Sequence, residues 1–155
     1  MATKFNQSLI VYKESELKNI CDQIALQLPS QAIIGLKGDM GAGKTTFVRY
    51  LSSALGSPDW VNSPTYSIIQ QYLAKEHTII HIDLYRCNSD QEIDQLDILS
   101  SYKDKIILII EWFDKTQLFS PDLTLAFGIE NDQRSITFSS DKFNWISALN
   151  NTDAE

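Results

Sequence analysis

The feature that most constrains the fold is a glycine-rich segment, GDMGAGKTT, at residues 38–46. It follows the apolar run AIIGLK at residues 32–37 and leads into a helical pattern, KTTFVRYLSSAL. The spacing Gly-x-x-x-x-Gly-Lys-Thr completes the Walker A pattern, in which a strand, a loop and a helix form a cradle for phosphate. The chain is therefore expected to contain a strand–loop–helix unit with a phosphate-binding loop.

Each part of this loop has a physical task. The glycines have no Cβ, so the backbone can take unusual dihedral angles and close round an anion. Backbone N–H groups and the start of the helix direct positive partial charge at the phosphates. Lys44 adds a full charge near the β- and γ-phosphates, Thr45 offers a hydroxyl to Mg²⁺, and Thr46 reaches the α-phosphate or only caps the helix. The predicted nucleotide-binding residues in this loop are Gly38, Asp39, Met40, Gly41, Ala42, Gly43, Lys44, Thr45 and Thr46.

Two carboxylates follow apolar runs that are typical of buried strands: Asp83 after IIHI and Glu111 after IILII. An unpaired charge at such a position is costly, and a metal ion removes that cost. A phosphate site of this kind needs a carboxylate to hold or orient Mg²⁺. The pattern leaves open which acid touches the metal, although Glu111 follows the more hydrophobic run; Asp83 could instead orient a water molecule. The alternative for either acid is helix capping or an ion pair with Arg86.

The remaining pattern alternates strands and helices and then forms a hairpin. Strands are expected at residues 8–12, from 66, 77–85 and 105–112, helices at 15–28, 44–55, 89–96 and 141–149, and a hairpin at 122–140. Ser15 and Ser89 are the predicted helix N-caps, the latter in a capping box with Glu92. This order predicts one α/β domain over residues 1–155, a P-loop NTPase-type mixed sheet flanked by helices, with a frayed tail at 150–155.

Charge and composition limit the partners. With 20 acidic and 13 basic residues, the net charge is −7. The surface should therefore repel a nucleic-acid backbone, and any role in nucleic-acid metabolism should depend on a partner protein that binds the nucleic acid. The N-terminus lacks a signal-peptide pattern and the aliphatic run IILII is too short to span a bilayer, which favours a cytoplasmic protein without membrane contact. Cys21 and Cys87 show no metal-ligand spacing and fit reduced thiols.

The pattern leaves three outcomes for a bound nucleotide: hydrolysis, transfer to a substrate, or sensing without chemistry. A GTPase is disfavoured because the chain has neither an NKxD reader nor a DxxG switch. A small-molecule kinase is disfavoured, since Arg86 and Arg134 are the only arginines after the loop helix and no insertion is long enough for a lid. A non-catalytic nucleotide-sensing module remains the third alternative.

Four segments in order resemble one family: GDMGAGKTT, VNSPTY at residues 61–66, HIDLYR at 81–86 and IIEW at 109–112. They look like TsaE, the bacterial P-loop ATPases needed to make threonylcarbamoyladenosine next to the anticodon of tRNA. The match covers most of the chain, from about residue 15 to 134. The resemblance implies a Mg²⁺-dependent ATPase that is weak alone and acts on a transferase pair, TsaD and TsaB, so that tRNA is engaged only through them.

The resemblance also implies roles for single residues. The Mg²⁺ ligands fall on Thr45 and Glu111, and the catalytic set comprises Lys44, Asp83, Glu111, Thr65 and Trp112. Thr65 belongs to a segment that looks like a switch loop on the γ-phosphate side, and Trp112 falls on a functionally sensitive tryptophan.

Other positions are left with alternatives. A turn residue and core filling are the alternatives for Thr65 and Trp112. Arg134 is a candidate for the adenine side. His81 is interpreted as a strand residue rather than a catalyst. Family members usually have a glycine where Asp97 stands, which puts the local turn in doubt.

Overall fold

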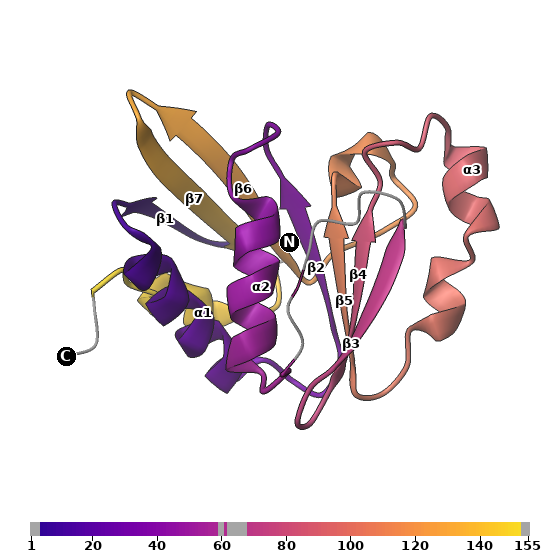
Figure 1. Cartoon of the computed structure of the whole chain (residues 1–155), viewed down its shortest axis with the longest axis horizontal. Coiled ribbons are helices and arrows are strands. Elements are labelled where there is room, and N and C mark those ends of the chain that lie inside the picture. The colour runs from indigo at the N-terminus through magenta and orange to yellow at the C-terminus, as the bar shows by residue number, and fades with distance from the viewer. Residues whose placement is uncertain (1–3, 59–60, 62–67, 153–155) are drawn as a thin grey trace.

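The computed structural model describes residues 4–58, 61 and 68–152, and within them the strands form one sheet in the order β1-β7-β6-β2-β5-β4-β3 (Figure 1). The strands are β1 (Phe5–Val11), β2 (Ala32–Lys37), β3 (Ile69–Leu73), β4 (Thr78–Asp83), β5 (Ile106–Glu111), β6 (Leu123–Glu130) and β7 (Gln133–Ser140). The central strand β2 runs parallel to β5 and β6, and β5 runs parallel to β4. The pairs β1–β7, β6–β7 and β3–β4 are antiparallel. The prediction of a mixed α/β sheet with a C-terminal hairpin is confirmed.

Helices cover both faces of the sheet, so the molecule has two apolar layers (Figure 1). The helices are α1 (Glu14–Gln27), α2 (Lys44–Ala54) and α3 (Asp90–Gln95), with short 3₁₀ turns η1 (Ile98–Ser101), η2 (Phe113–Lys115) and η3 (Asn144–Ala148). α1 and α2 pack on one face against Ile79, Ile107 and Ile109. α3 and η1 contribute to the other layer with Ile82 and Ile110. β5 is buried at every position, as expected for a strand covered on both sides.

Two details of the predicted helices are wrong. Ser15 does not cap α1, because the helix begins at Glu14 and the carboxylate of Glu16 accepts the N–H groups of Tyr12 and Lys13. The expected final helix is only the 3₁₀ turn η3, since five residues give too few i→i−4 hydrogen bonds for an α-helix.

Two other expectations about segment starts have different outcomes. Ser89 does cap α3, accepting the N–H of Glu92 at 3.2 Å. The strand expected from Tyr66 is β3, which begins at Ile69, and Tyr66 itself lies outside the described residues.

The strand register brings three strand ends to one edge of the sheet. In the β4–β5 pair Asp83 lies opposite Glu111, and in the β2–β5 pair Leu36 lies opposite Glu111. The glycine-rich loop, residues 38–43, leaves β2 at this same edge. Across the described stretches of chain, none of the helices has the length and apolar character needed to cross a bilayer.

Candidate functional site

The glycine-rich loop connects β2 to the first turn of α2 through backbone that only glycine adopts easily. Gly38 and Gly43 have φ values of 142° and 115°. A Cβ on Gly38 would lie 2.6 Å from the carbonyl oxygen of Phe127 on β6. The loop therefore passes close to the neighbouring strand, and a side chain at either glycine would strain it. Asp39 and Met40 form its exposed rim, whereas Ala42 is buried.

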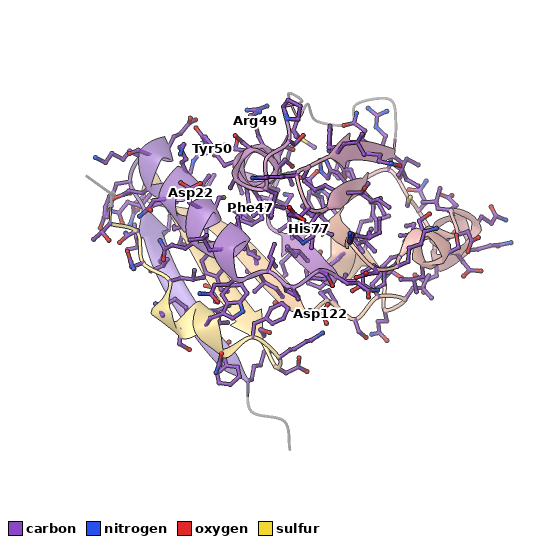
Figure 2. The ribbon with its side chains drawn as sticks, turned by 90° about the horizontal axis from the view of Figure 1, so that it is seen from below. Asp22, Phe47, Arg49, Tyr50, His77 and Asp122 are labelled. Carbon is purple, nitrogen blue, oxygen red and sulfur yellow. The ribbon has the colours of Figure 1, made fainter. Side chains whose placement is uncertain are left out.

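Helix α2 is fixed against the sheet, which fixes the residues of its first turn. Phe47 is fully buried and packs edge-to-face on Phe127 with ring centroids 5.9 Å apart. Figure 2 shows Phe47 inside the molecule, whereas Arg49 and Tyr50 of the same helix lie near its edge. The Arg49 Nε donates to the carbonyl of Val61 at 3.0 Å. Thr45 and Thr46 thus project from a helix that cannot shift easily.

Lys44 is 6% exposed and turns back into the loop. Its Nζ donates to the carbonyls of Gly38 and Asp39, the latter at 2.9 Å, and lies 4.3 Å from the centroid of the Trp112 ring. Burial lowers the pKa of Lys44, and the carboxylates of Glu111 and Asp83 oppose that shift. The ammonium group is therefore enclosed by the loop that is predicted to hold phosphate.

Glu111 ends β5 with its carboxylate almost fully buried, at 1% exposure. Its Oε1 accepts the hydroxyl of Thr45 at 3.2 Å, and its Oε2 lies 3.1 Å from Nε2 of His81. The glutamate and the threonine that the resemblance assigns to one metal therefore meet, although they are 66 positions apart.

Asp83 is half-buried beside Glu111 and accepts the N–H of Tyr85 at 2.9 Å. Burial raises the pKa of Asp83, the Tyr85 hydrogen bond opposes the rise, and the charge of Glu111 adds to it. The ion pair with Arg86 that the sequence left open does not form among the described side chains.

Trp112 follows β5 in the left-handed region, with φ at 61°. Its backbone N–H donates to the backbone carbonyl of Leu36 at 2.8 Å. Its ring is tilted against the ring of Tyr85, with centroids 5.2 Å apart. With Asp39, Asp114 and Phe127 it lines an open cavity of about 300 Å³ beside the glycine-rich loop. The tryptophan thus contacts Lys44 and lines this cavity, and it also packs against the apolar layer that contains Ile110.

Two other predicted residues have different outcomes. Arg134 is exposed on β7, with a guanidinium nitrogen 3.8 Å from the point where a Cβ on Gly43 would lie, so it borders the loop. Thr65 and its segment, residues 63–65, lie outside the described residues. The sequence reasoning missed the contact of His81 with Glu111. The segment HIDLYR could have indicated this contact. Side chains two positions apart on a strand share a face, so His81 lies on the same face of β4 as Asp83, which ends the strand beside Glu111.

The chemistry of these donors fits a hard divalent cation. A carboxylate and a hydroxyl are oxygen ligands of the kind Mg²⁺ takes, usually together with phosphate oxygens of a bound nucleotide. Within the part of the chain that the structure describes, no three His, Cys, Asp or Glu side chains converge on a possible metal position. Thr45 and Glu111 thus supply oxygen ligands of a kind that such an ion accepts.

Comparison with known proteins gives consistent results. A family model described as threonylcarbamoyl adenosine biosynthesis protein TsaE matches residues 11–137. A Haemophilus influenzae protein named tRNA threonylcarbamoyladenosine biosynthesis protein TsaE is 33% identical over 118 residues, which cover 74% of this chain and 75% of that protein. An Aquifex aeolicus protein of the same name is 34% identical over 111 residues, covering 70% and 78%. The crystal structure of Bacillus subtilis YdiB shares the fold, with a TM-score of 0.69 at 24% identity over 90% of this chain and 88% of that one.

Proposed function

Because the chain belongs to the TsaE family of threonylcarbamoyladenosine biosynthesis proteins, we propose that it is a Mg²⁺-dependent ATPase that supports this modification of tRNA. The observation that carries the proposal is the contact between Thr45 and Glu111 at 3.2 Å, directly beside the enclosed Lys44. A helix N-terminus, a buried ammonium group and a pair of oxygen ligands together form the kind of site that holds a nucleotide with its metal.

Each residue has a role that follows from its position. The N–H groups of the loop and the ammonium of Lys44 bind the β- and γ-phosphates. Thr45 and Glu111 hold Mg²⁺, which when bound neutralises charge on the phosphate oxygens. Asp83, at the next strand end, accepts a hydrogen bond from the attacking water and orients it. Trp112 covers Lys44 and limits the access of bulk water, and Arg134 borders the loop where the nucleotide enters.

A second candidate is transfer of the phosphate to a small molecule. The open cavity of about 300 Å³ next to Trp112 could receive such a substrate. We place hydrolysis first because Arg86 and Arg134 are the only arginines in the sequence after α2, whereas a kinase usually clamps the transferring phosphate with several arginines of a lid. The acidic chain is also suited to act through other proteins rather than on tRNA itself. The partners proposed are the transferase pair TsaD and TsaB, in the cytoplasm.

The test is phosphate release by the wild type and by Lys44→Ala, measured alone, with the TsaD–TsaB pair and with tRNA added. Lys44→Ala should lower turnover by at least about 100-fold, since it removes a charge aimed at the transition state. Lys18→Ala is the control, because Lys18 is an exposed residue of α1 that pairs with Asp22 on the same helix. Unchanged turnover in Lys44→Ala would contradict the assignment, and a labelled product other than inorganic phosphate would favour the kinase.

A further inference from the structure

A buried histidine lies against the glutamate of the proposed metal site. The side chains of His81 and Glu111 are 0% and 2% exposed, and Nε2 lies 3.1 Å from Oε2. The two come from neighbouring parallel strands: Asp83 is opposite Glu111, and His81 precedes Asp83 by two residues on the same face of β4. The backbone of the sheet therefore fixes this contact.

A carboxylate that binds a metal ion only accepts hydrogen bonds, so in the proposed site Nε2 of His81 is the donor to Oε2 of Glu111. This leaves Oε1 directed at the Thr45 hydroxyl, 3.2 Å away. The two oxygens of one carboxylate thus have separate partners on opposite sides.

This arrangement has a cost that packing alone does not explain. Nδ1 of His81 is buried and has no hydrogen-bond partner among the described residues. The ring is packed beside Tyr72 of β3, with centroids 6.4 Å apart, in a layer that is otherwise mainly apolar. A leucine would avoid the unpaired ring nitrogen but would leave Oε2 of the buried Glu111 without this hydrogen-bond partner. The polar contact that His81 makes is therefore the one with the Glu111 carboxylate.

We propose that His81 is a positioning residue that holds the carboxylate of Glu111 in the orientation needed for Mg²⁺. The torsion that turns a glutamate carboxylate is soft and nearly two-fold. With Oε2 bound to His81, Oε1 stays directed toward Thr45, where the proposed metal is shared. This inference rests on the proposed function, because it assumes that Glu111 is a Mg²⁺ ligand. Groups that orient a ligand in this way commonly contribute about 10- to 100-fold to metal affinity.

The experiment measures binding of a fluorescent ATP analogue as a function of Mg²⁺ and in EDTA. His81→Leu should raise the Mg²⁺ concentration for half-maximal binding by about 10- to 100-fold and leave affinity in EDTA unchanged. His81→Gln, whose amide nitrogen can take the place of Nε2, should keep most of the Mg²⁺ dependence. His81→Asn carries the same amide but is too short to reach Glu111, so it should behave like His81→Leu. The Gln–Asn comparison decides the matter if His81→Leu does not fold.

Three outcomes would overturn the inference. They are wild-type Mg²⁺ dependence in His81→Leu, equal behaviour of the Gln and Asn variants, and a loss of affinity in EDTA as large as that in Mg²⁺. A double variant adds a further readout. If His81 acts only through Glu111, adding His81→Leu to Glu111→Gln should change Mg²⁺ dependence no further, and an additional loss would overturn the inference. A wild type that binds ATP without any Mg²⁺ effect would instead refute the proposed function.

Discussion

At the scale of single residues, the site crowds carboxylates around one enclosed lysine. Glu111 and Asp83 end adjacent strands in register, and Asp39 and Asp114 also act on Lys44. Like charges held at one sheet edge repel each other until a cation lies between them. Holding these carboxylates at one sheet edge therefore costs stability, as is common where function requires a particular charge arrangement.

Asp83→Asn tests this crowding. Burial raises the pKa of Asp83 above its ordinary value of about 3.9, so the folded protein disfavours the ionised form. Below about pH 3.9 the carboxyl is protonated in both the folded and the unfolded state, so it does not lower the free energy of unfolding. The loss of stability appears as pH rises through the folded-state pKa. The asparagine can still accept the N–H of Tyr85, and it should raise the free energy of unfolding at pH 7 by less than about 1 kcal/mol, given screening by solvent.

The measurement is urea unfolding in EDTA without nucleotide, over a series from pH 7 to pH 4. The increase in the free energy of unfolding should shrink toward acid pH. In a separate assay of phosphate release at pH 7, Asp83→Asn should turn over ATP more slowly than the wild type. Asp22→Asn is the control, because Asp22 lies on the exposed face of α1. A gain that is equal at every pH would show that charge is not its cause.

At the scale of elements, the turn after α3 places an L residue in the left-handed region of backbone conformation. Asp97 directly follows the C-cap Leu96 and takes the left-handed conformation, with φ at 50° and ψ at 44°. The turn is thus present, but an L residue occupies a position that glycine takes at less cost. Aspartate is among the residues that tolerate this conformation.

Asp97→Gly should therefore raise the free energy of unfolding by up to about 1 kcal/mol, less the backbone entropy that glycine loses on folding. Asp94→Gly, three residues earlier and inside α3, should lower it by about 0.3 kcal/mol, because aspartate is itself a poor helix former. Thermal unfolding of the two variants beside the wild type checks both. Stabilisation by both glycines, or destabilisation by both, would show that the helix end does not control the effect.

The same elements show what the sequence could predict. β2, β5 and the β6–β7 hairpin were predictable because apolar runs and turn residues act locally, and the loop glycines fix the strand–loop–helix unit. The start of α1 and the short η3 were not, since the carboxylate of Glu16 and the packing of the C-terminal segment decide them. The sequence predicts an ordinary strand residue at His81, because its partner Glu111 is on another strand and only the β4–β5 register brings the two together.

At the scale of the whole molecule, position and charge bear on the proposed division of work between this chain and partner proteins. The two apolar layers support the sheet, and the proposed nucleotide site lies at the edge where β2, β4 and β5 end. The net charge of −7 is spread over only 155 residues. A nucleotide can be held there by the local dipoles and Lys44, whereas a long polyanion meets the repulsion of the whole surface.

The chain alone should therefore bind tRNA more weakly than the range of about 10⁻⁴ to 10⁻⁶ M typical of non-specific nucleic-acid binders. Fluorescence anisotropy of labelled tRNA, titrated with the chain at low salt, checks this under the conditions that most favour electrostatic binding. The TsaD–TsaB pair, titrated with and without the chain and ATP, is the comparison. If the chain acts through its partners, ATP should change tRNA binding only when the pair is present. Tight, salt-sensitive binding of tRNA by the chain alone would contradict the proposed division of work. Such binding would require a local basic surface strong enough to overcome the net negative charge.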